Sequence, residues 1–183
     1  DVELLKPIVR GEFNIEGYPD ETWMNLVVAG KPDQATLGPD PPGALTSNAG
    51  FDVSASRAFL EKMVGRLKRE TPATRVSVFI GPGRFSKEEA KMLRSLGADR
   101  IEMYTEKYAD HPDSVGEYRE LADLALATGL GLNAGHDLTS ENLPTLIRAI
   151  PEIDEVSIGH ALICDALRFG MKETVARYLK ALA

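Results

Sequence analysis

The feature of this sequence that most constrains its fold is a regular alternation of short apolar segments with longer amphipathic ones. Short runs of apolar residues are typical of strands, and apolar residues spaced three and four apart are typical of helices. Six strands are predicted, at 13–17, 34–38, 75–81, 100–105, 131–135 and 155–160. Because a helical segment follows each one, the pattern predicts a parallel sheet with helical crossovers.

Helices are predicted between these strands, and one more precedes the first strand. Ser86, Glu89 and Gly97 have the spacing of an N-terminal capping box and a C-terminal glycine around one helix, and Pro144 fits the first turn of another. The segment 39–51 is rich in Pro, Gly, Ser and Asn and predicts a long loop. The predicted helices are 1–10, 19–30, 52–70, 86–97, 113–129, 140–150 and 161–182.

The length of the repeating unit favours a (β/α)8 barrel. The strands begin roughly 28 residues apart, whereas eight units of a barrel take about 250 residues and this chain has 183. The helix at 1–10 also has no strand before it. We therefore predict a single α/β domain over 1–183 that supplies strands 3–8 of a barrel, without the first two strands. The alternative is an open, doubly wound sheet of six strands; no G-x-G-x-x-G or P-loop follows a strand.

Composition excludes some classes of function and predicts a compartment. A formal net charge of −7 argues against a broad nucleic-acid-binding surface, which normally needs a basic face. No apolar run approaches the ~18 residues of a membrane-spanning helix. A single cysteine, Cys164, and the lack of a secretory signal at the start predict the reducing cytoplasm. No Cys/His cluster has the spacing of metal ligands.

Two of the three histidines lie at predicted strand ends. Both candidate folds bind ligands at the carboxyl ends of their strands, where His136 and His160 are found. An imidazole titrates near neutral pH, so His136 could act as a general acid or base. Alternatively, His136 has a structural role, in which its side chain caps a helix or makes a hydrogen bond within a loop. The third histidine, His111, lies in a predicted loop and is expected to be solvated.

Other strand ends carry a carboxylate and a glycine. Glu16 lies in an apolar strand, where a charge is costly unless it is paired or functional, so it is either a general base or an ion-pair partner. Gly159 and His160 join the last strand to the last helix, where backbone amides can bind an anion; an ordinary tight turn is the alternative. Thr46 lies in the long loop, which is either a lid over the site or a loop that runs over the protein surface without that role.

Three segments together resemble the PdxJ family of pyridoxine 5′-phosphate synthases: "GLNAGHDLTSENL", "IPEIDEVSIGHALICDAL" and "KYAD". The resemblance covers essentially the whole chain. It implies a (β/α)8 barrel, usually assembled as an octamer, which uses no metal or organic cofactor. It implies condensation of 1-deoxy-D-xylulose 5-phosphate with 3-amino-2-oxopropyl phosphate, giving pyridoxine 5′-phosphate, phosphate and water.

The resemblance also implies roles for six residues. By resemblance, Glu16 is a catalytic proton acceptor and His136 a proton donor. The remaining four positions match residues that bind the phosphorylated substrates: Thr46, Asp137, Gly159 and His160.

Departures from the family pattern leave a second class of function open. The family's Asn-x-Asp-His and His-x-Arg segments do not occur, and Tyr104 and Glu106 stand where the family usually has His and Gly. The alternative is a non-catalytic paralogue that binds phosphorylated metabolites. An aldolase-like barrel would need a lysine at a strand end for a Schiff base, and none of the six predicted strand ends has one.

Overall fold

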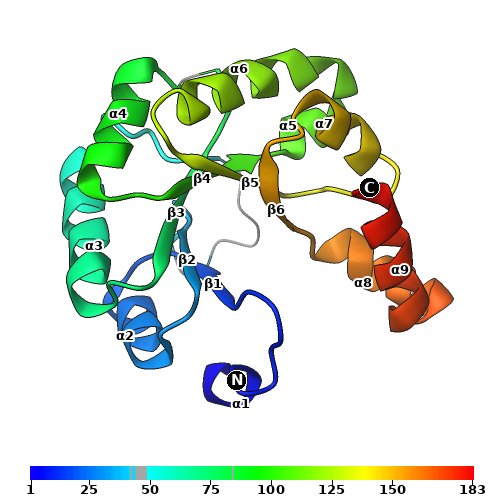
Figure 1. Ribbon diagram of the computed structural model, residues 1–183, viewed down its shortest axis with the longest axis horizontal. Helices are drawn as coiled ribbons and strands as arrows, with labels where there is room; N and C mark the ends of the chain where they lie inside the picture. The colour runs from blue at the N-terminus through cyan, green and yellow to red at the C-terminus, as the bar shows by residue number, and fades with distance from the viewer. Residues whose placement is uncertain (42, 44–48, 84) are drawn as a thin grey trace.

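Six parallel strands form one curved sheet with helices on its convex side (Figure 1). The computed structural model describes residues 1–41, 43, 49–83 and 85–183. The strands pair in chain order, so each neighbours the strand before it. Together they make an arc like half of a barrel. The strands are β1 (Asn14–Gly17), β2 (Gln34–Leu37), β3 (Arg75–Ile80), β4 (Arg100–Tyr104), β5 (Gly131–Gly135) and β6 (Ile153–Ser157).

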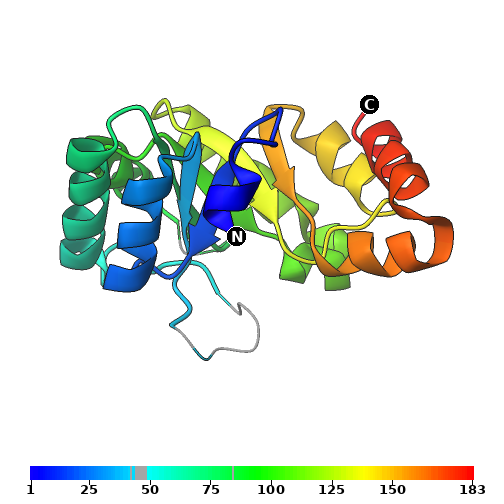
Figure 2. The same cartoon turned by 90° about the horizontal axis from the view of Figure 1, so that it is seen from below.

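The helices follow the strands in alternation, as predicted. Helices α8 and α9 lie beyond β6, at the opposite end of the molecule from α2 and α3 (Figure 2). The α-helices are α1 (Val2–Leu5), α2 (Glu21–Gly30), α3 (Arg57–Glu70), α4 (Lys87–Leu96), α5 (Glu106–Asp110), α6 (Val115–Leu126), α7 (Leu143–Ala149), α8 (His160–Phe169) and α9 (Met171–Ala181); one 3-10 turn, η1, spans Pro112–Ser114. In the described part of the chain, no helix has the length and apolar character needed to cross a membrane.

The predictions were wrong in extent for the helices at both ends of the chain, and one short helix was missed. The helix expected at 1–10 ends at Leu5, because Pro7 has no N–H to continue the helical hydrogen bonds. The helix expected at 161–182 is two helices, broken at Gly170, whose φ of 81° lies in the region that glycine tolerates best. Helix α5 was missed because five residues are too few to show a helical period.

Predicted helix ends are confirmed around α4. The Ser86 side chain accepts from the backbone N–H of Glu89, the Glu89 carboxylate accepts in return from Ser86, and Gly97 ends the helix in a left-handed conformation. Glu89 also accepts a hydrogen bond from the Ser54 hydroxyl at 2.9 Å. The cap of α4 therefore also anchors the segment that leads into α3.

The two faces of the sheet differ in polarity. One set of alternate strand residues is apolar and fully buried, including Ala35, Val78 and Leu132, and belongs to the single hydrophobic cluster shared with the helices. Each large side chain buried in this way stabilises the fold by about 1.5–3 kcal/mol. The other set is largely polar and faces the concave side of the arc. Strand register brings two rows of this inner set together: Glu16, Thr36 and Ser77 in one, and Phe79, Glu102, Asn133 and Glu155 in the other.

Candidate active site

A cavity of about 1010 Å³ lies at the carboxyl ends of β1, β4, β5 and β6. Five of the six residues predicted from the sequence line it: Glu16, His136, Asp137, Gly159 and His160. The sixth, Thr46, lies outside the described residues. Residues more than a hundred positions apart in the chain therefore share one site, as the rule for parallel strands predicts.

Glu102 lies in the same cavity and was missed by the sequence analysis. Its side chain is fully buried. The hydroxyls of Ser157 and Thr36 lie near enough to favour its ionised form, but among the described residues neither carboxylate oxygen makes a hydrogen bond of normal geometry. Burial raises the pKa of Glu102, and the nearby Glu16 raises it further. The signal that picked out Glu16, an acidic residue inside an apolar strand, was equally present in "RIEMY".

Glu16 and Glu102 form a pair of coupled carboxyls. Glu16 lies at the edge of the sheet and is exposed as a residue, but protein atoms surround much of its carboxyl and displace part of its water. Loss of water raises the pKa of Glu16 to about 7, and the negative charge of Glu155 acts in the same direction. Because two nearby carboxyls do not both ionise easily, the pair retains a proton at a pH where isolated carboxyls are fully ionised.

Gly135 makes room for this pair. A Cβ atom at position 135 would lie 2.3 Å from Oε1 of Glu102, far closer than two such atoms can approach. The glycine of the "NAGH" segment is therefore required by the carboxyl on the neighbouring strand, with which it shares the concave face.

His136 is held between two aromatic rings. Its ring centroid lies 5.7 Å from that of Phe79 and 4.8 Å from that of Tyr104. Burial lowers the pKa of His136, although the acidic side chain of Asp137 opposes the shift. The imidazole is therefore largely neutral at neutral pH and is a stronger acid once protonated.

The backbone at His136 is strained and is fixed by Thr105. His136 has a φ of 82° and Asp137 a φ of 53°, a left-handed conformation that costs energy for residues other than glycine. The buried Thr105 hydroxyl lies 2.7 Å from the carbonyl of Gly135 and 2.5 Å from that of His136, and donates to them. This contact connects the end of β4 to the loop that carries the histidine.

Replacing Thr105 by valine is expected to lower any turnover that depends on His136 by up to about 100-fold, because small displacements of a reacting group have effects of that size. Valine keeps the shape of the side chain and removes the hydroxyl. The measurement is kcat for the Val and Ser variants, since Thr105→Ser retains the donor and should stay near the wild type. A valine variant with unchanged kcat would show that the hydroxyl does not position His136.

Gly159 and His160 form the start of α8. Gly159 is the N-cap residue and His160 the first residue of this ten-residue helix, and both are exposed at the cavity. The first amides of a helix have no partner within it and favour negative charge. No group of three or more His, Cys, Asp or Glu side chains that could hold a metal ion occurs among the described residues.

Comparison with known proteins places this arrangement in a family. The model of the pyridoxal phosphate biosynthesis protein PdxJ matches residues 1–183. The chain belongs to the PdxJ family. Pyridoxine 5′-phosphate synthase of Parabacteroides distasonis is 46% identical over 183 residues, covering 97% of this chain and 75% of the relative. The enzyme of the same name from Cytophaga hutchinsonii is 48% identical with the same coverage.

More distant solved structures share the fold alone. An oxidized active mutant of (S)-mandelate dehydrogenase matches 100% of this chain and 62% of its own, with a TM-score of 0.62 and 14% identity. An aldolase, QR15, matches 85% of this chain and 72% of its own, with a TM-score of 0.58 and 16% identity. The PdxJ chain is thus an α/β protein with a barrel-like arrangement of parallel strands, from an enzyme family of vitamin B6 biosynthesis.

Proposed function

We propose that this chain is a pyridoxine 5′-phosphate synthase. In this reaction 1-deoxy-D-xylulose 5-phosphate and 3-amino-2-oxopropyl phosphate condense to pyridoxine 5′-phosphate, phosphate and water. The observation that carries the proposal is one cavity lined by Glu16, Glu102 and His136 together with the exposed start of α8, in a chain 46–48% identical to synthases of that name.

The acid–base groups suit the chemistry of this condensation. An amine adds to a ketone, water and phosphate leave, and a ring closes, so protons move at nearly every step. Glu16 acts as the proton acceptor, because its raised pKa makes it a stronger base than an ordinary carboxylate. His136 acts as the proton donor to a leaving oxygen. Glu102, beside Glu16, keeps the shared proton within the cavity.

Two phosphorylated substrates need sites for anions. The backbone amides at Gly159 and His160 hold one phosphate, since a helix start favours negative charge and glycine leaves the approach open. Asp137, next to His136 at the cavity wall, contacts a phosphorylated substrate, as the family resemblance implies. Thr46 binds the phosphate of the sugar substrate; this role rests on the resemblance alone.

We further propose that β1–β6 are strands 3–8 of a (β/α)8 barrel, and that 1–183 belong to one domain. The parallel order of the strands supports this arrangement, as do the outer edges of β1 and β6, which pair with no further strand in the described part of the chain. We also propose that the protein works in the cytoplasm as a homo-oligomer. Strongly exposed apolar side chains on α8 and α9, such as Leu167 at 85% and Leu179 at 63%, favour burial against other protein.

Incubating the purified full-length protein with both substrates tests the function. Pyridoxine 5′-phosphate and inorganic phosphate should appear in equal amounts, and neither should form when one substrate is left out. Binding of the substrates without product, in a correctly folded protein, would instead support the non-catalytic paralogue. Tyr104 and Glu106, which depart from the usual family residues, are the positions to revert in that case.

A further inference from the structure

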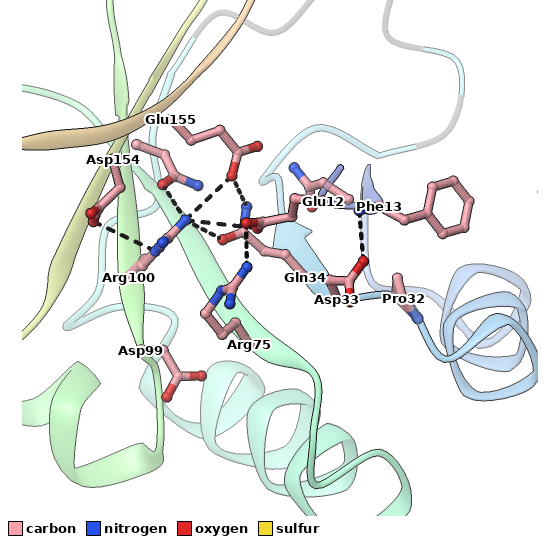
Figure 3. Close-up of polar contacts among 12 residues, drawn as sticks. Glu12, Phe13, Pro32, Asp33, Gln34, Arg75, Asp99, Arg100, Asp154 and Glu155 are labelled. Carbon is pink, nitrogen blue, oxygen red and sulfur yellow. Dashed lines mark hydrogen bonds and ion pairs between the residues drawn. The ribbon is translucent and has the colours of Figure 1, made fainter. Parts of the chain in front are cut away.

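A polar cluster fills the concave side of the sheet near the amino ends of the strands (Figure 3). At its centre is Arg100 of β4. Its Nη1 lies 3.1 Å from Oε1 of Gln34 and 3.3 Å from Oε2 of Glu155, and donates to both. Nε2 of Gln34 also donates to Oε2 of Glu155 at 3.0 Å. Two donors from two other strands therefore fix the carboxylate of Glu155.

The negative charge of this cluster is not fully neutralised. The charged or titratable side chains around Glu155 come from β1 and the residues before it, from β3, from β4 and from β6: Glu12, Glu16, Arg75, Arg100, Glu102 and Asp154. Arg75 pairs with Glu12. Arg100 is shared among three carboxylates, lying 3.3 Å from Glu155, 3.6 Å from Asp154 and 3.7 Å from Glu12. One guanidinium cannot balance all three.

Glu155 lies in the same row of the sheet as the active-site carboxyl Glu102. Glu102 pairs with Asn133 on β5, and Asn133 pairs with Glu155 on β6. Register partners in a sheet point to the same side, and neighbouring strands are about 4.8 Å apart, so Glu155 is about 10 Å from Glu102 at the backbone. Long carboxylate side chains on one concave face can approach more closely than that.

We propose that Glu155, held in place by Arg100 and Gln34, is a positioning residue whose charge keeps a proton on the Glu16–Glu102 pair at neutral pH. The proposal rests on the role of Glu16 proposed above. The charge of Glu155 raises the pKa of both carboxyls of the pair, after the larger effect of burial. Burial raises the pKa of Glu155 itself, and the neighbouring carboxyl of Glu12 raises it further. Arg100 and Gln34 act in the opposite direction and favour the ionised form of Glu155.

Glu155→Gln in the full-length protein tests this proposal. Glutamine keeps the size and hydrogen-bonding capacity of the side chain and removes the charge. The apparent pKa of the Glu16–Glu102 pair should fall by about one pH unit. Carbon-13 NMR of protein labelled at the glutamate side-chain carboxyls follows this titration without turnover. In parallel, the acid limb of the plot of kcat/KM against pH should move to lower pH by the same amount. At a fixed pH on that limb, such a shift raises kcat/KM by up to about tenfold.

Asp154→Asn is the matched control, because it removes the same charge from another partner of Arg100 but leaves Glu155 in place. It should leave both the NMR titration and the acid limb unchanged. An unmoved titration in Glu155→Gln, or an equal shift in Asp154→Asn, would overturn the proposal. If the titration moves but the acid limb does not, Glu155 acts on the pair as proposed and the assignment of Glu16 as the base is the part that fails.

Discussion

Replacing His136 by alanine in the full-length protein is expected to abolish the formation of pyridoxine 5′-phosphate. The loss should be at least about 10²–10⁴-fold in kcat, the usual contribution of a positioned acid or base. The imidazole lies between Phe79 and Tyr104 at the wall of the cavity, and its lowered pKa makes the protonated form a ready donor. Product formation by chromatography measures the loss, and the thermal melt should stay close to that of the wild type.

Two further variants separate the chemistry of His136 from its backbone strain. Asparagine tolerates the left-handed conformation better than alanine but cannot transfer a proton, so His136→Asn should be equally inactive. His111→Ala removes an exposed histidine at the end of α5 and should retain full activity. Wild-type turnover in either His136 variant would refute the role of this residue.

Replacing Glu16 by glutamine is expected to lower kcat/KM by about 10²–10⁴-fold and to remove one limb of its pH dependence. A general base acts in its ionised form. Because the pKa of Glu16 is raised to about 7, the wild-type rate should rise as the pH rises through about 7. In Glu16→Gln the residual rate should lack that rise.

Profiles of kcat/KM between pH 5 and 9 make the comparison for Glu16. Glu21→Gln is the control, since it removes an exposed carboxylate that pairs with Arg66 outside the cavity, and it should leave the profile unchanged. A Glu16→Gln protein that keeps both its rate and the limb near pH 7 would show that another group is the base.

Sequence periodicity predicted the order of the strands and most of the helices, because a sheet with one face covered by helices imposes a regular pattern. It did less well where a single residue decides a boundary. Pro7 ends α1 and Gly170 divides the last two helices. The spacing of apolar residues in the sequence reveals neither break. The strand predicted at 155–160 lies at Ile153–Ser157. Its pairing with β5 has a register shift at Leu132 and Asn133, and such an irregularity interrupts the alternation on which the prediction rests.

The site could be predicted only where a residue lies at a strand tip. Glu16, His136 and Gly159 were found in that way, and the cavity brings them together. Glu102 and Glu155 lie deeper in their strands, where a charged residue in the sequence is equally consistent with an outward ion pair. Their importance depends on register across three strands, which no single segment encodes. Thr105 is the last residue of the strand predicted at 100–105, but its contact with a carbonyl 31 residues away is visible only in the folded chain.

The polar inner face of the sheet also affects the folding equilibrium. The pKa values of Glu16 and Glu102 are raised from the ordinary glutamate value of 4.5 to about 7 and about 8. Between pH 4.5 and those values the native state therefore binds more protons than the unfolded chain, and the free energy of unfolding decreases as the pH rises. Ionisation of Glu16, which produces the base proposed above, also weakens the fold. The proposed role of Glu16 therefore predicts that, within this range of pH, activity rises as stability falls.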